Sequence, residues 1–210
     1  LIMSPASMGE ELRFKEDDVK EILQRITIPL SNSLAFFQEY YTLFTKTKDF
    51  VEIESDRPFD KWILKRTYDF CNQMSQSLDD YKINPINDML IKYIDDLNNN
   101  YIRLNRDILK GKDEEDQDGM KCMKALSTLK KVLTILSVYL STILPFFCEK
   151  LHKSLGNDGE SVHLKYVPNI SKYNIVDNDV EMITYMLKVI NMITLIRTEN
   201  NVQLKKPLKN

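Results

Sequence analysis

The chain has 210 residues, of which 43% are hydrophobic and 29% charged, so it can bury a sizeable core as one domain or as one domain and a fragment. A net charge of −2 and a pI near 5.8 exclude a strongly basic, generic nucleic-acid binder, so any RNA contact must use a local patch. Only two histidines and three widely spaced cysteines are present, which argues against a metal site and against a disulfide framework.

Residues 1–15 are expected to be a lead-in segment from the middle of a larger protein. The sequence shows no basic-then-apolar leader and no uninterrupted apolar run long enough for a bilayer, so we expect neither secretion nor a membrane span. Free thiols favour a reducing compartment, and the expected location is therefore cytoplasmic.

The first predicted helix begins at the acidic residues 16–18, which suit a positive helix start. Apolar residues then keep helical spacing as far as Phe44, although Pro29 should kink or break the helix near Ile28. Charged and polar residues with Pro58 predict a linker over residues 45–60.

A second helix is predicted from residue 60 to Leu78, with the only tryptophan, Trp62, among its apolar positions. Lys61, Lys65 and Arg66 form a small basic cluster near its start. This cluster adds Lys61 and Lys65 to the candidate RNA contacts, as outer contacts.

A third, long helix should run from Asn84 to Gly111, around which the rest of the chain is organised. Asn84 and Pro85 suit a helix start, while Lys110 and Gly111 suit a helix end. Its apolar positions recur at steps of three and four, and they are Ile86, Leu90, Tyr93, Leu97, Tyr101, Leu104 and Ile108. The opposite face carries Lys92, Arg103, Arg106 and Lys110.

Two interpretations of this basic face stay open from spacing alone. It can be a solvated helix surface, because Asp88, Asp95 and Asp96 dilute its charge. It can also be a surface for RNA, with phosphates on the cations and with Asn100 and Tyr101 contacting a base or ribose.

The acidic run 112–118 predicts a solvated turn before another apolar-periodic stretch, Met120 to Leu155, which Pro145 should kink. A last helix is predicted from Asp177 to about Thr198, and Val202 and Leu204 alternate with polar residues as at the start of a strand. These elements predict an all-α protein, an antiparallel bundle of four to five long helices with a short strand at the C-terminal end. The expected division is 1–15, 16–165 as the helical domain, and 166–210 as a helix that opens a C-terminal region.

Residues 93–106, which read Y-I-D-D-L-N-N-N-Y-I-R-L-N-R, resemble a segment of the isoleucyl-tRNA synthetases with the pattern F-I-D-x-L-T-N-W-Y-[IV]-R-x-N-R. Asn100 stands where that family has tryptophan. Further segments resemble the same family in the same order, and they are residues 12–19, 28–37, 60–64, 125–151, 161–164 and 197–208.

The resemblance implies a piece of an isoleucyl-tRNA synthetase, a helical anticodon-binding domain that reads the anticodon stem-loop of the tRNA for isoleucine. The parent enzyme would attach isoleucine to its tRNA with ATP and magnesium, using catalytic and editing domains that this piece lacks. No catalytic residue, cofactor or metal is expected in the piece itself, and DNA and membranes are not expected partners. The alternatives are the equivalent domain of a valyl- or leucyl-tRNA synthetase, or a helical module that docks other synthetases.

Overall fold

The computed structural model describes residues 16–157, 159–168, 178–203 and 206. This part of the chain is helical and contains no strand, which confirms the all-α prediction. A strand was expected to start at Val202, but Val202 is not in a strand. Leu204, the next residue of that expected strand, and the lead-in segment 1–15 lie outside the described residues. The elements are α1 (Glu16–Ile22), η2 (Leu23–Thr27), α2 (Ile28–Thr45), α3 (Pro58–Asp79), α4 (Asn84–Asp95), η3 (Asp96–Ile102), α5 (Arg106–Leu109), α6 (Met120–Tyr139), η4 (Leu140–Thr142), α7 (Pro145–Ser154), η5 (Val162–Leu164) and α8 (Asn178–Glu199).

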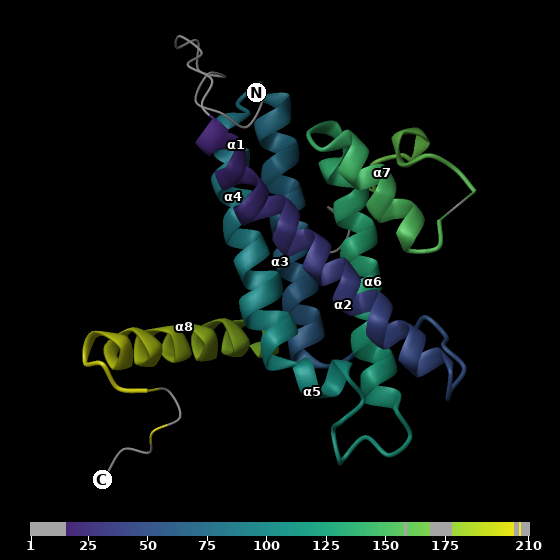
Figure 1. Ribbon diagram of the computed structural model, residues 1–210, viewed down its shortest axis with the longest axis vertical. Helices are drawn as coiled ribbons and strands as arrows, with labels where there is room; N and C mark the ends of the chain where they lie inside the picture. The colour runs from purple at the N-terminus through teal and green to yellow at the C-terminus, as the bar shows by residue number, and fades with distance from the viewer. Residues whose placement is uncertain (1–15, 158, 169–177, 204–205, 207–210) are drawn as a thin grey trace.

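The helices form a bundle in which α3 packs against α4 on one side and α6 on the other (Figure 1). Helix α4 is antiparallel to α3, whereas α6 runs in the same direction as α3, so the bundle is only partly antiparallel. Helix α2 passes obliquely in front of them, α7 packs against α6, and α8 lies across one end of α3. The core between them consists of aliphatic and aromatic side chains, among them Ile26, Leu30, Phe37, Trp62, Ile63, Met74, Leu90, Tyr93, Leu97, Leu126, Leu129, Leu133 and Leu136. None of the helices in the described ranges combines the length and apolar content that a membrane-spanning segment needs.

All three cysteines are buried in this core and none is in a disulfide. Burial raises the pKa of Cys122 to about 11 and that of Cys148 to about 12. Both thiols are therefore protonated near neutral pH, which suits packing and not redox chemistry.

Both prolines that were expected to disturb a helix do so, in different ways. Immediately before Pro29 lies η2, a π-helical segment, and the amide of Ile28 donates to the carbonyl of Leu23, five residues back. The wider turn leaves room for the proline ring, so the helix passes through Pro29 without stopping. At Pro145 the helix breaks, because α6 ends at Tyr139 and α7 starts anew at the proline.

The long third helix contains a second π-helical segment, η3, and this shifts the buried seam by one residue. The predicted positions are buried as far as Leu97 and Tyr101, but Leu104 is 42% exposed and Ile108 is only partly buried. Asn105 and Leu109 take the core positions instead. A π turn holds one residue more than an α turn, so every side chain after it is rotated relative to the α-helical register.

The end of the third helix follows the predicted chemistry. Gly111 has a φ of 63°, its amide donates to the carbonyl of Ile108, and the amide of Lys112 donates to that of Asp107. This pair of bonds is a Schellman motif, which needs a left-handed residue at the glycine.

The acidic turn that follows Gly111 caps the next helix. Asp116 accepts the amides of Lys121 and Cys122, and Asp118 accepts the amide of Met120. These carboxylates therefore satisfy the unpaired amides at the positive end of α6.

The shifted seam predicts that two leucines near the end of the third helix contribute very differently to the free energy of unfolding. Leu109→Ala should lower the free energy of unfolding by about 2–5 kcal/mol, because Leu109 is completely buried and its removal leaves a cavity. Leu104→Ala should cost about 1 kcal/mol at most, because that side chain is largely exposed. Urea denaturation of the two variants measures the difference, and an equal or reversed cost would contradict the shift.

Candidate nucleic-acid interface

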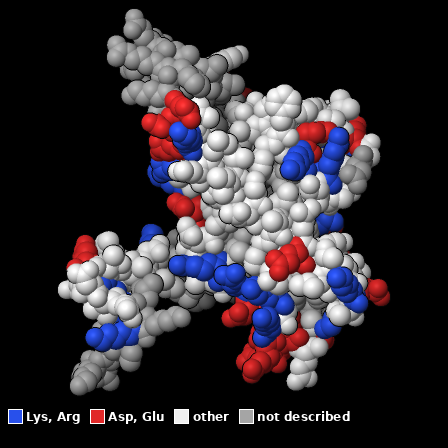
Figure 2. All heavy atoms as spheres, in the orientation of Figure 1, with Lys and Arg blue, Asp and Glu red and all other residues white. Residues whose placement is uncertain are grey.

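Three cations, Arg103, Arg106 and Lys110, form what we call the cationic stripe. Both arginines are exposed, and neither has a carboxylate partner among the described residues. The Lys110 ammonium lies 5.2 Å from the centroid of the Tyr40 ring, which holds it at the surface between α5 and α2. Figure 2 shows Lys and Arg side chains gathered across this end of the bundle, above a cluster of acidic side chains. The stripe is thus open to a ligand with negative charge.

The local backbone aims the stripe outward. Asn105 lies between the two arginines, has a non-helical backbone (φ −97°, ψ 14°) and is 3% exposed. Its side chain accepts a hydrogen bond from Arg57 at 2.7 Å and donates to the carbonyl of Tyr101 at 3.0 Å. Because Asn105 points inward, its neighbours Arg103 and Arg106 are left at the surface.

A shallow cavity of about 190 Å³, the stripe pocket, adjoins the two arginines. It lies between α2 and η3 and is also lined by Asn32, Ser33, Phe36, Asn98 and Ile102. Asn98 joins its two walls, since its Oδ1 accepts a hydrogen bond from the Ser33 hydroxyl at 2.6 Å. The stripe therefore borders a hollow that has both polar and apolar walls.

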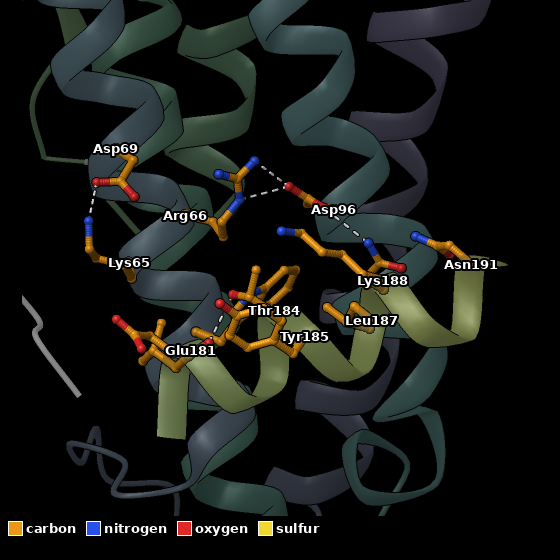
Figure 3. Close-up of a pocket in the computed structure, with 13 residues that line it drawn as sticks. Lys65, Arg66, Asp69, Asp96, Glu181, Thr184, Tyr185, Leu187, Lys188 and Asn191 are labelled. Carbon is orange, nitrogen blue, oxygen red and sulfur yellow. Dashed lines mark hydrogen bonds and ion pairs between the residues drawn. The ribbon is translucent and has the colours of Figure 1, made fainter. Parts of the chain in front are cut away.

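A larger cavity of about 580 Å³, the α8 pocket, lies on the other side of η3, between α3, η3 and α8 (Figure 3). Arg66 donates from Nε and one Nη to Asp96, at 2.8 and 2.6 Å, and Asn100 donates to the other oxygen of Asp96 at 3.0 Å. Lys65 is paired with Asp69 on the same wall. The structure thus brings the predicted contacts Lys65 and Asn100 together in this pocket, which is separate from the cationic stripe.

A buried polar network lies behind the stripe and fixes its position. The Asp60 side chain is fully buried and accepts hydrogen bonds from Ser55 (2.5 Å), Arg57 (3.1 Å) and Tyr101 (2.7 Å). Burial raises the pKa of Asp60, while the guanidinium of Arg57 and the two hydroxyl donors act in the opposite direction. The network joins the start of α3 to the end of the third helix.

The structure corrects the part expected of Tyr101. This side chain is 0% exposed, and its hydroxyl donates to Asp60 and to the carbonyl of Ala125. Burial, with the adjacent Asp60 carboxylate, raises the pKa of Tyr101 well above its usual value, so the hydroxyl stays a donor. Tyr101 therefore stabilises the core and is left out of the proposed RNA surface.

The other predicted contacts lie at the surface to different degrees. Asn100 is half-buried and hydrogen-bonded to Asp96, and Lys65 is half-buried and paired. Lys61 is half-buried one turn before Lys65, and its charge acts on Asp56. Arg103, Arg106 and Lys110 remain the residues whose charge is least engaged by the protein.

Sequence reasoning missed the α8 residues that complete the larger cavity, chiefly Glu181, Tyr185 and Lys188. It also missed Asp60 and Asn105 as the polar centre of the core. Asn105 stands four residues after Tyr101, but the apolar spacing favoured Leu104 at this point of the seam.

The chain is similar to known proteins over its whole length. A model of the family described as the anticodon-binding domain of tRNA ligase matches residues 60–210. The whole chain aligns at 32% identity with the cytoplasmic isoleucine–tRNA ligase of Caenorhabditis elegans and at 31% with that of Schizosaccharomyces pombe, covering 19% and 21% of those proteins. The corresponding ligase of Arabidopsis thaliana is 32% identical, with 18% covered. The chain thus spans about a fifth of the length of the curated relatives it matches.

The buried network predicts that removing the Tyr101 hydroxyl group destabilises the fold. Tyr101→Phe should lower the free energy of unfolding by about 1–3 kcal/mol, because Asp60 loses a donor that buried water cannot easily replace. Tyr166→Phe is the matched control, since that ring is 97% exposed, and it should leave the stability unchanged. Chemical denaturation measures both, and a neutral Tyr101→Phe would show that the network does not stabilise the fold.

Proposed function

Because this chain belongs to the family of anticodon-binding domains of tRNA ligases, we propose that it recognises the anticodon stem-loop of a tRNA for isoleucine. The observation that carries the proposal is the cationic stripe, two exposed arginines that have no carboxylate partner in the described part of the chain, beside a lysine. Elsewhere in the bundle, cations such as Lys124 and Lys130 are paired with acidic residues of the 46–57 linker. The stripe is therefore a local patch of the kind that a protein of net charge −2 needs for RNA.

Guanidinium groups suit the phosphates of an RNA loop because each can offer two parallel N–H donors to the phosphate oxygens. The anticodon loop is single-stranded, so its bases can turn away from the stem and be read at their edges. Arg103, Arg106 and Lys110 would hold the phosphates. Asn100 and Lys65, which line the α8 pocket on the other side of η3, and Lys61 would be outer contacts.

The parent protein in this proposal is an isoleucine–tRNA ligase, like the relatives that the chain matches. It would attach isoleucine to its tRNA with ATP and magnesium, bound by catalytic and editing domains outside this chain. A cytoplasmic setting belongs to the same proposal, supported by the names of the eukaryotic relatives.

The stripe can be tested by the salt dependence of binding. Replacing Arg103→Glu and Arg106→Glu together should weaken binding of the isoleucine anticodon stem-loop by about 10- to 100-fold. The slope of log affinity against log salt should fall by about one to two units, because two phosphate contacts are lost. Fluorescence anisotropy between 50 and 200 mM salt gives both quantities.

The control carries the same change of charge far from the stripe. Lys20→Glu with Arg25→Glu alters α1 and η2, at the opposite end of the bundle (Figure 1), where both cations are exposed and paired within their own helix. If the two double variants changed the slope equally, only net charge would matter and the site assignment would be wrong.

A second candidate function is protein docking, and one observation favours it. Helix α8 exposes large apolar side chains, Met182, Val189, Met192, Leu195 and Ile196, that water does not favour. A stem-loop with a swapped anticodon separates the two functions. Anticodon recognition predicts much weaker binding of the swapped loop, whereas equal binding would support docking of proteins such as other synthetases. Preference for a valine or leucine anticodon would move the proposal to those ligases.

A further inference from the structure

We propose that the α8 pocket takes a single unstacked nucleobase, with the Tyr185 ring as the stacking surface and Arg66, Asp96 and Asn100 facing the edge of the base. The inference deepens the proposed function and rests on it for the source of the base. The chemical class it names, a nucleobase, could also come from a free nucleoside, and the experiment below separates these sources.

The size and construction of the pocket suit a small planar ligand. Its volume of about 580 Å³ falls within the range of small-molecule sites, which is about 300–1,000 Å³. Figure 3 shows side chains of α3 and η3 on one side and of α8 on the other converging on the same space. Trp62, Val180 and Leu187 are buried and give its floor an apolar character.

The charge of the pocket argues against a phosphate group. Three cations and three carboxylates line it, namely Lys65, Arg66, Lys188, Asp69, Asp96 and Glu181. Two of the cations already have partners, as Lys65 binds Asp69 and Arg66 binds Asp96. A neutral ligand fits this balance, whereas an anion would meet Asp69 and Glu181.

The hydrogen-bonding groups that remain suit the edge of a base. Arg66 uses Nε and one Nη on Asp96, which leaves donor capacity on the second Nη. Asn100, which lines the pocket, donates its amide to Asp96, and this leaves its oxygen free to act as an acceptor. The wall formed by α3 and η3 thus offers both a donor and an acceptor, the two kinds of group that the edge of a nucleobase presents.

An exposed aromatic ring completes the site. Tyr185 is 65% exposed, and the ammonium of Lys188 lies 5.4 Å from its ring centroid. Stacking of a base on an aromatic ring is worth a factor of about 5 to 150 in affinity when the ring is removed. Because the pocket is charge-balanced and does not attract phosphates, stacking on the Tyr185 ring would supply most of the binding free energy.

The position of the pocket connects it to the cationic stripe. Segment η3 is the shared wall, since Asp96 and Asn100 line the α8 pocket while Asn98 and Ile102 line the stripe pocket. An RNA loop with its phosphates on Arg103 and Arg106 would therefore pass directly over the segment that faces the α8 pocket.

The test uses the full chain and isoleucine anticodon stem-loops in which 2-aminopurine replaces one loop base at a time. We expect one loop position to change its fluorescence on binding far more than the others. Tyr185→Leu should abolish that change and weaken binding at least fivefold, with the salt slope unchanged because no phosphate contact is lost. Tyr185→Trp should retain both.

Tyr166→Leu is the matched control, because it makes the same substitution at an exposed ring on another part of the surface. Thermal unfolding should show that Tyr185→Leu keeps the fold. If Tyr185→Leu leaves every fluorescence change and the affinity intact while Arg103→Glu with Arg106→Glu still lowers the salt slope, the pocket assignment is wrong and the proposed function stands.

A titration with free 2-aminopurine riboside covers the case in which the stem-loop does not bind. Saturable binding that Tyr185→Leu removes would retain the nucleobase site and assign it to a free nucleoside, with the proposed function overturned. No binding of either the stem-loop or the riboside would overturn both.

Discussion

The Asp60 carboxylate is buried at the point where three helices meet, and the geometry of the surface depends on how it is satisfied. A buried charge is tolerated only when it is paired and hydrogen-bonded, and Asp60 obtains this from Arg57, Ser55 and Tyr101. Arg57 also reaches Asn105, so the same network fixes the irregular residue between the two stripe arginines. The interior of this protein thus sets the direction of its outer cations through a chain of hydrogen bonds.

The π-helical segment η3 separates two surfaces with different electrostatics. On one side lie arginines that pair with no carboxylate of the described residues, and on the other side lies a pocket in which cations and carboxylates balance. One short segment can do this because residues two positions apart on a helix, such as Asp96 and Asn98, project to opposite sides. π-helical turns occur frequently at functional sites, and here the turn separates charge from hydrogen-bonding groups.

Local chemistry in the sequence was sufficient for much of the fold. Pro145 at a helix start and Gly111 after a helix end each impose a backbone geometry that few other residues allow, so their effects could be predicted. The exchange of Leu104 for Asn105 in the core could not, because the extra residue of a π turn leaves no mark on apolar spacing. Asp60 resembled an exposed residue of a first helical turn, and only its neighbours in space reveal its burial.

The candidate site was predictable only where charge alone defines it. Arg103, Arg106 and Lys110 could be assigned to a solvated face from their spacing. The same spacing placed Tyr101 in the apolar seam, and its burial there rules out the RNA contact that was also expected of it. The α8 pocket was beyond sequence reasoning, because apolar residues such as Met182 and Met192 occur all around α8 and do not indicate which face meets α3.

Helix α8 is attached to the bundle mainly through α3, by the three side chains Val180, Ile183 and Leu187 in its first half. A helix with so few anchors opens more readily than the core helices, so its amides should exchange with solvent at a lower energetic cost than those of α3 or α6. A ligand that contacts both walls of the α8 pocket would hold α8 against α3 and so oppose this local unfolding. Occupancy of the pocket and the folding of α8 are therefore thermodynamically linked, and each would report on the other.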